Sequence, residues 1–192
     1  MSIFSTNVCR WLPRRAIIAV PFIVLAVLAT FLTLAHLAVI ALGIPPQFGF
    51  QLPMRLTGLL LLLSGFALLA WFFTYRKPAD VLVSTYVTFS RLRKRAEDSR
   101  EYPRRTEPLV IRGPYRYVRH PLYSIVVLLI LGWWLLLDYS FLLISAFLLL
   151  PWFSLVVAPF EERELRAIFG DDYGKYAKRV PRIIPFTKRP SK

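Results

Sequence analysis

Two short polar stretches carry the side chains best suited to chemistry, and apolar runs separate them. The first contains Arg119 and His120, the latter one of only two histidines in the chain. The second is the adjacent pair Glu161 and Glu162. Neighbouring residues on a helix point about 100° apart, so we expect the two glutamates to play different parts. One carboxylate could accept from a ligand ammonium or ribose diol, while the other pairs with a protein arginine.

Each stretch also has a simpler interpretation. Arginines and tyrosines such as those of Arg112 to Tyr123 often anchor the end of a membrane helix in lipid headgroups. Glutamates such as Glu161 to Glu164 are common in the solvated first turn of a helix, where the helix dipole favours them. However, charged groups cost several kcal/mol inside a bilayer, so polar residues crowded at the edge of an apolar run indicate a site.

The composition indicates a membrane protein. Hydrophobic residues make up 56% of the 192 residues and aromatic residues 15%, which exceeds the apolar content of ordinary soluble domains. The net charge of +14 would suggest nucleic acid as the partner of a soluble chain. Because the basic residues lie between and beyond apolar runs, we expect membrane lipids as partners and no nucleic acid.

Four apolar runs must position the two polar stretches: Ala16 to Gly43, Leu56 to Thr74, Pro121 to Leu137 and Tyr139 to Pro159. About 20 apolar residues span a bilayer as a helix, so we predict an all-α, polytopic membrane protein with about four transmembrane helices. Asp138 marks a tight turn between the last two runs. These runs should form an antiparallel hairpin that brings His120 and Glu161 to the same membrane face.

The charge distribution predicts the orientation. All but one of the 25 lysines and arginines precede the first run, lie in residues 76–120 or follow Pro159. By the positive-inside rule, both termini and the site should face the cytoplasm. We therefore divide the chain into helices one and two (1–75), a basic cytoplasmic loop (76–107) and a carboxy-terminal region (108–192). Within the loop, Ala79 to Ser90 is apolar enough for an interfacial helix.

Metal-ion chemistry is not expected. The two histidines, His36 and His120, stand far apart in the sequence, and Cys9 is the single cysteine. Metal sites normally need three or four closely placed histidine, cysteine or carboxylate ligands. His36 lies within the first apolar run, where we interpret it as a structural residue.

Residues 108 to 186 resemble the isoprenylcysteine carboxyl methyltransferase and phospholipid methyltransferase superfamily. The resemblance rests on the two-run hairpin and on these motifs: Gly113-Pro114-Tyr115-Arg116-Tyr117-Val118-Arg119-His120-Pro121-Leu122-Tyr123, Glu161-Glu162, Phe169-Gly170, Tyr173, Tyr176 and Val180-Pro181. In that family the arginine-histidine-proline motif and the glutamate pair bind S-adenosylmethionine at the cytoplasmic membrane face. A lipid-like substrate enters from the bilayer.

The resemblance implies roles for individual residues. Those implied to bind the cofactor are Tyr115, Arg119, His120, Pro121, Tyr123, Glu161, Glu162, Tyr173 and Tyr176. Arg119 and Glu162 are also the expected catalytic residues. An amine acceptor must lose a proton, which a carboxylate such as Glu162 could take, whereas a carboxylate or thiolate acceptor needs no base. The chain departs from the family at Ile125, where many members have glycine.

The expected function is therefore that of a membrane S-adenosylmethionine-dependent methyltransferase acting on a carboxylate, thiol or amine head group of a lipid-like or prenylated acceptor. A small soluble acceptor is the alternative substrate. NADPH-dependent membrane sterol reductases share the arginine-histidine-proline motif, but they usually continue with asparagine-tyrosine where this chain has Leu122-Tyr123. A non-enzymatic lipid-binding membrane protein would explain the basic loop but would leave Glu161 and Glu162 without a role.

Overall fold

The computed structural model describes residues 14–82, 84–86 and 109–187, and this described part contains helices and no strands. A short helical stretch covers residues 78–82 and 84–86. The named elements are α1 (Arg14–Ala41), α2 (Leu52–Tyr75), a 3-10 turn η2 (Gly113–Arg116), α4 (Pro121–Leu137), α5 (Ser140–Trp152), a π-helical segment η3 (Phe153–Val157) and α6 (Ala158–Arg179). The all-α prediction is confirmed.

Each predicted apolar run forms a helix. The helices over 17–41, 52–75 and 140–179 are long and apolar enough to cross a membrane, and α4 is a shorter apolar helix. The bounds of α4 are those predicted for the third run. The fourth run continues as one helix through α5, η3 and α6, so it extends well beyond its predicted end at Pro159. Pro159 lies in the first turn of α6, directly after the π-helical segment, where its missing N–H interrupts the regular α-helical bonding least.

Only part of the predicted loop, residues 76–107, belongs to the residues that the structure describes. Residues 79–82 and 84–86 of the predicted interfacial helix, Ala79 to Ser90, are helical. The remainder of that helix and the strongly basic residues 91–105 lie outside the described residues.

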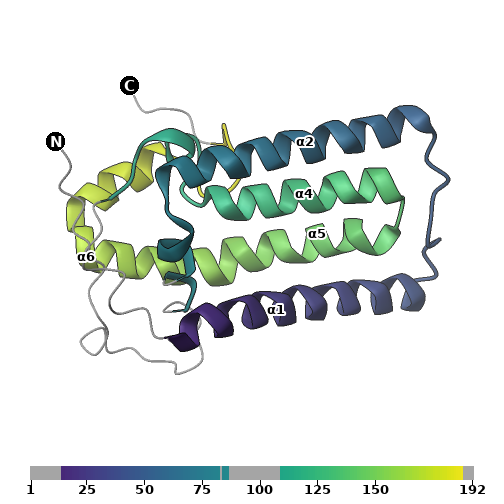
Figure 1. Cartoon of the computed structure of the whole chain (residues 1–192), viewed down its shortest axis with the longest axis horizontal. Coiled ribbons are helices and arrows are strands. Elements are labelled where there is room, and N and C mark those ends of the chain that lie inside the picture. The colour runs from purple at the N-terminus through teal and green to yellow at the C-terminus, as the bar shows by residue number, and fades with distance from the viewer. Residues whose placement is uncertain (1–13, 83, 87–108, 188–192) are drawn as a thin grey trace.

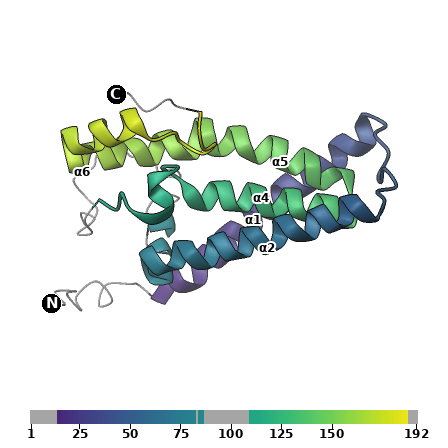
Figure 2. The same ribbon diagram turned by 90° about the horizontal axis from the view of Figure 1, so that it is seen from above.

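The helices lie side by side in the order α2, α4, α5, α1 (Figure 1). Seen from above, α1 runs obliquely to the other three (Figure 2). At one end of the bundle α1 begins, α2 ends and α4 begins, and α6 projects beyond this end. We call it the α6 end, and the opposite end, where α4 turns into α5, the Asp138 end.

Glycines allow α2 and α4 to pack closely. A Cβ atom added to Gly58 would lie 2.6 Å from the backbone nitrogen of Leu136, and one added to Gly65 would lie 2.7 Å from Cδ2 of Leu129. Small residues at a membrane helix interface let two backbones approach and gain dispersion contacts. The end of α2 is therefore held at a defined position beside the start of α4.

Asp138 closes the opposite end of the bundle. Its backbone adopts the left-handed conformation with φ of 62°, and the residue is 1% exposed. The carboxylate accepts N–H groups from Phe48, Gly49 and Phe50 at 3.0, 2.6 and 2.8 Å. Burial alone would raise the pKa of Asp138, but these three backbone donors outweigh it and lower the pKa. The loop between α1 and α2 is thus tied to the turn between α4 and α5.

We predict that Asp138→Asn destabilises the fold, because an amide has no negative charge and only one acceptor oxygen for three N–H groups. The loss of charge-assisted bonds should cost about 1.5–3 kcal/mol, which corresponds to roughly 3–12 °C in the unfolding temperature. Tryptophan fluorescence during heating in detergent micelles measures this change. The control is Asp172→Asn, since that side chain is 84% exposed and should leave the temperature unchanged. Equal temperatures for Asp138→Asn and the parent protein would contradict the prediction.

Candidate functional site

The arginine-histidine segment starts from a tight turn against the end of α2. Gly113 opens η2 with a φ of +62°, a conformation that residues with a Cβ rarely adopt. A Cβ atom there would also lie 2.5 Å from the ring of Tyr75. The carbonyl of Pro114 then accepts the N–H of Tyr117 at 3.1 Å. Glycine is therefore required for the chain to turn this close to α2.

Backbone hydrogen bonds join this segment to the residues that follow α6. The N–H of Arg119 donates to the carbonyl of Pro181 at 2.9 Å, and the N–H of His120 donates to the carbonyl of Arg182 at 3.0 Å. His120 also precedes Pro121, the first residue of α4. The start of α4 and the segment after α6 are thus fixed against each other.

Glu162 is the centre of a buried ion cluster and is 3% exposed. Arg182 donates to both of its carboxylate oxygens, at 2.9 and 3.1 Å, and Arg119 Nη1 lies 3.0 Å from Oε1. His120 Nε2 lies 3.4 Å from the same oxygen. Burial alone would raise the pKa of Glu162, but hydrogen bonds from His120 and Arg182 and the charges of both arginines lower it to about 2.

The π-helical segment gives Arg182 a further contact. The N–H of Ala158 donates to the carbonyl of Phe153 rather than to that of Ser154, as the π register requires. Pro159 has no N–H with which to reach Ser154. The carbonyl of Ser154 instead accepts from Arg182 Nη1 at 3.2 Å. The irregular helix therefore creates the acceptor that orients Arg182 toward Glu162.

The two glutamates do lie in different surroundings. Glu161 Oε2 lies 3.2 Å from Nδ1 of His120, on the opposite side of the imidazole from Glu162. Burial would lower the pKa of His120, but hydrogen bonds and charge from Glu161 and Glu162 outweigh it, so the pKa is raised. The imidazole is thus held between two carboxylates, which favours its protonated form.

Aromatic rings support the imidazole from the side of the bundle. His120 stacks on Tyr123 with ring centroids 5.4 Å apart and an interplanar angle of 10°. Tyr123 in turn stacks on Phe153 at 4.5 Å and 5°. This column of rings fixes the plane of the imidazole and connects it to the start of the π-helical segment.

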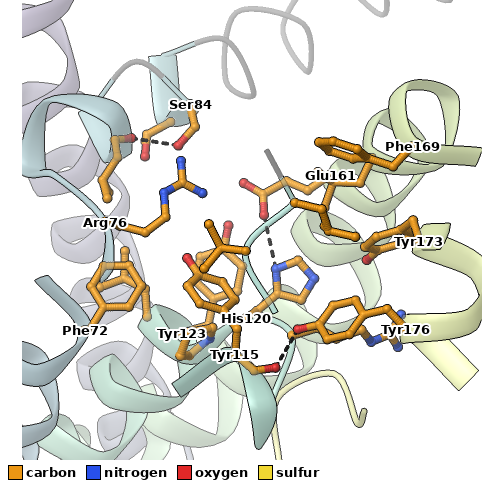
Figure 3. A pocket seen from close by; sticks show the side chains of 18 residues that line it. Phe72, Arg76, Ser84, Tyr115, His120, Tyr123, Glu161, Phe169, Tyr173 and Tyr176 are labelled. Carbon is orange, nitrogen blue, oxygen red and sulfur yellow. Dashed lines mark hydrogen bonds and ion pairs between the residues drawn. The ribbon is translucent and has the colours of Figure 1, made fainter. Parts of the chain in front are cut away.

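A pocket opens beside this cluster at the α6 end (Figure 3). Its empty space of about 860 Å³ includes open solvent, so the pocket is an open cleft rather than an enclosed cavity. Its lining includes all but one of the predicted site residues, namely Tyr115, Arg119, His120, Pro121, Tyr123, Glu161, Tyr173 and Tyr176. The exception is Glu162, which is buried behind Arg119 and His120 and does not line this pocket.

Several polar atoms of the pocket residues are buried and make no hydrogen bond within the described part of the chain, among them Arg119 Nε and Tyr173 Oη. Such atoms cost free energy unless a ligand or water satisfies them. Burial, with the charge of Glu162, raises the pKa of Tyr173 to about 12, so its hydroxyl stays protonated and can donate. The hydroxyl of Tyr176 is already used, because it donates to the carbonyl of Tyr115 at 2.7 Å.

Sequence reasoning missed several residues of the site. Arg182 belongs to the motif that begins with Val180-Pro181, yet only the structure shows its bidentate contact with Glu162. A whole wall of the pocket also comes from the amino-terminal half, where no motif was visible: Phe72, Arg76, Val81, Ser84 and Thr85. Leu165 and Phe169 line it from α6. His36 is exposed on α1, packs edge-on to Phe141 at 5.9 Å and does not line the pocket.

Comparison with known proteins identifies the family. The phospholipid methyltransferase family model matches residues 53–172. A methanethiol S-methyltransferase of Crocosphaera subtropica is 36% identical over 90 residues, which cover 44% of this chain and 32% of that protein. Protein-S-isoprenylcysteine O-methyltransferase B of Arabidopsis thaliana is 38% identical over 79 residues, which cover 41% of this chain and 40% of that protein.

The chain thus spans well under half the length of these two relatives. No solved structure matches it. The family match nevertheless extends over more than half of the chain and includes both the arginine-histidine-proline segment and the glutamate pair. The chain therefore belongs to the phospholipid methyltransferase family.

Proposed function

We propose that this protein is a membrane-embedded methyltransferase that uses S-adenosylmethionine and acts on the head group of an amphipathic acceptor. The observation that carries the proposal is the pocket at the α6 end, where Glu161 and His120 converge with the unpartnered Arg119 Nε and Tyr173 Oη. Membership of the family supports methyl transfer as the reaction.

The residues of the pocket suit this cofactor. When bound, S-adenosylmethionine supplies a methyl group that its positively charged sulfonium has already activated. Glu161 offers a negative charge to cationic groups of the ligand. Arg119 Nε and Tyr173 Oη offer buried donors to a carboxylate or a ribose hydroxyl.

We assign Glu162 the role of a positioning residue. Its pKa of about 2 keeps it ionised at neutral pH, and it contacts Arg119, His120 and Arg182 rather than the pocket. A carboxylate held in this way orients Arg119 and His120 toward the ligand but is a weak base. Glu161, whose carboxylate reaches the pocket, is the better candidate for any proton transfer.

We predict that Glu161→Gln and His120→Ala each weaken S-adenosylmethionine binding by about tenfold or more, because each removes a charged partner from a half-buried site. Titration calorimetry of the protein in detergent micelles measures the dissociation constant. The matched control is His36→Ala, which removes an imidazole far from the pocket and should bind normally.

Glu162→Gln should differ from these two variants by lowering the unfolding temperature as well, since it leaves the buried Arg119 and the partly exposed Arg182 without their anion. Unchanged binding in both Glu161→Gln and His120→Ala would contradict the proposed site. Binding of NADPH instead of S-adenosylmethionine by the parent protein would favour a reductase.

We also propose that the α6 end faces the cytoplasm, because the basic residues accumulate at the termini and in residues 76–120. A reporter that is active only in the cytoplasm should therefore be active when fused after Lys192 and when inserted in residues 91–105. The activity of each fusion is measured in whole cells, and a reporter that is active only outside the cytoplasm serves as the control. Activity of the opposite reporter at either position would overturn this orientation.

The acceptor is proposed to be amphipathic because the pocket lies at one end of the membrane helices. Each methylene kept in lipid contributes about 0.8 kcal/mol to membrane retention, so a long tail holds the acceptor near the pocket without a dedicated tail site. We predict that the rate rises with tail length among acceptors that share one head group. Methyl transfer in liposomes measures this dependence, and equal rates for a tailless head group would refute it.

A further inference from the structure

One wall of the pocket comes from the amino-terminal half of the chain, whereas the other walls come from the carboxy-terminal half. Figure 3 shows Phe72, Arg76 and Ser84 on the side opposite Tyr173 and Tyr176, with the Arg76 side chain extending into the pocket. These three residues come from the end of α2 and from the short helical stretch after it. They lie outside the motifs on which the family resemblance rests. This wall is therefore a candidate for recognition of the acceptor rather than the cofactor.

Arg76 lies at the level expected for lipid headgroups. It follows Tyr75, whose ring packs edge-on to Trp71 at 6.2 Å, and Trp71 also contacts Tyr117 at 6.3 Å. Tryptophan and tyrosine gather where a membrane helix meets water. Arg76 thus stands where the apolar helix α2 ends, beside the place where the head of a membrane-bound acceptor would lie.

The position of Arg76 is well defined. Its N–H caps α2 by donating to the carbonyl of Phe72 at 3.2 Å, and Phe72 is 2% exposed. Close packing at Gly58 and Gly65 sets α2 against α4. Arg76 lines the pocket from the wall opposite the tyrosines, and its guanidinium carries a permanent positive charge.

A fixed positive charge selects among acceptor heads. It attracts a carboxylate, and it favours the thiolate form of a thiol. It repels a protonated amine by the same interaction. Glu161, the acidic residue of the pocket lining, comes from α6, and the basic residues Arg119 and His120 come from the segment before α4. Arg76 alone among these charged lining residues comes from the end of α2. An anionic acceptor and a cationic donor would each find a partner in this arrangement.

We propose that Arg76 binds the ionised head of the acceptor, so that the protein methylates carboxylates or thiolates in preference to amines. This inference rests on the proposed function. In the transfer, a lone pair of the acceptor oxygen or sulfur forms the bond to the methyl carbon. The electron pair of the broken carbon–sulfur bond stays on the donor sulfur, which becomes neutral. No proton is released, so no general base is needed.

The test compares binding and turnover for Arg76→Gln, Arg76→Lys and Lys77→Gln. Lys77 is the matched control, since it carries the same charge one residue away, is exposed and does not line the pocket. The probes are a fatty acid, an alkyl thiol and an alkylamine of equal chain length in neutral detergent micelles. Fatty acid binding is measured without cofactor, S-adenosylmethionine binding without acceptor, and methyl transfer with both.

We expect Arg76→Gln to weaken fatty acid binding and raise the KM for the acid by about tenfold, with S-adenosylmethionine binding unchanged. Arg76→Lys should retain part of the binding, and Lys77→Gln should behave like the parent protein. The parent should methylate the acid or the thiol faster than the amine. Comparing the acid with the thiol identifies which anion is the preferred acceptor.

Three results would overturn the inference: equal acid binding in Arg76→Gln and Lys77→Gln, a tenfold loss of S-adenosylmethionine binding in Arg76→Gln, or a preference for the amine in the parent protein. If the parent binds the fatty acid through Arg76 but does not bind S-adenosylmethionine, the proposed function fails while the anion-binding role of Arg76 stands. The two failures are therefore distinguishable.

Discussion

The site depends on one buried carboxylate with three cationic partners. Glu162 lies near the start of α6, and it links Arg119 and His120, which precede α4, with Arg182, which follows α6. A charge removed from water in this way is tolerated only when its partners surround it, and loss of one partner leaves the others uncompensated. The same cluster that orients the pocket residues therefore also fastens the end of the chain to the bundle.

Much of the fold could be predicted because apolar runs of the right length specify membrane helices. The bounds of α4 follow directly from such a run, and the short turn at Asp138 brings His120 and Glu161 to one end of the bundle. The separate surroundings of Glu161 and Glu162 follow from helical geometry alone. These features are local, or they require only that adjacent helices be antiparallel.

The remaining features depend on contacts between distant segments. Arg182 reaches Glu162 because backbone groups of residues 181–182 pair with Arg119 and His120, and no side-chain pattern encodes that pairing. The carbonyl that orients Arg182 becomes available only through a change of helical register before Pro159. The wall formed by the end of α2 likewise depends on close helix packing, which the residue types of that wall do not reveal.

The length of α4 has a consequence for the surrounding lipid. Its 17 residues reach about 26 Å, a few ångströms less than the ~30 Å hydrocarbon core, whereas α2 has 24 residues. A short helix beside longer ones is matched by local thinning of the bilayer or by a shift of its ends below the headgroups. Because α4 begins immediately after His120, either adjustment brings the part of the pocket around His120 closer to the acyl region of the lipid. Bilayer thickness thereby becomes a variable that acts on the pocket itself.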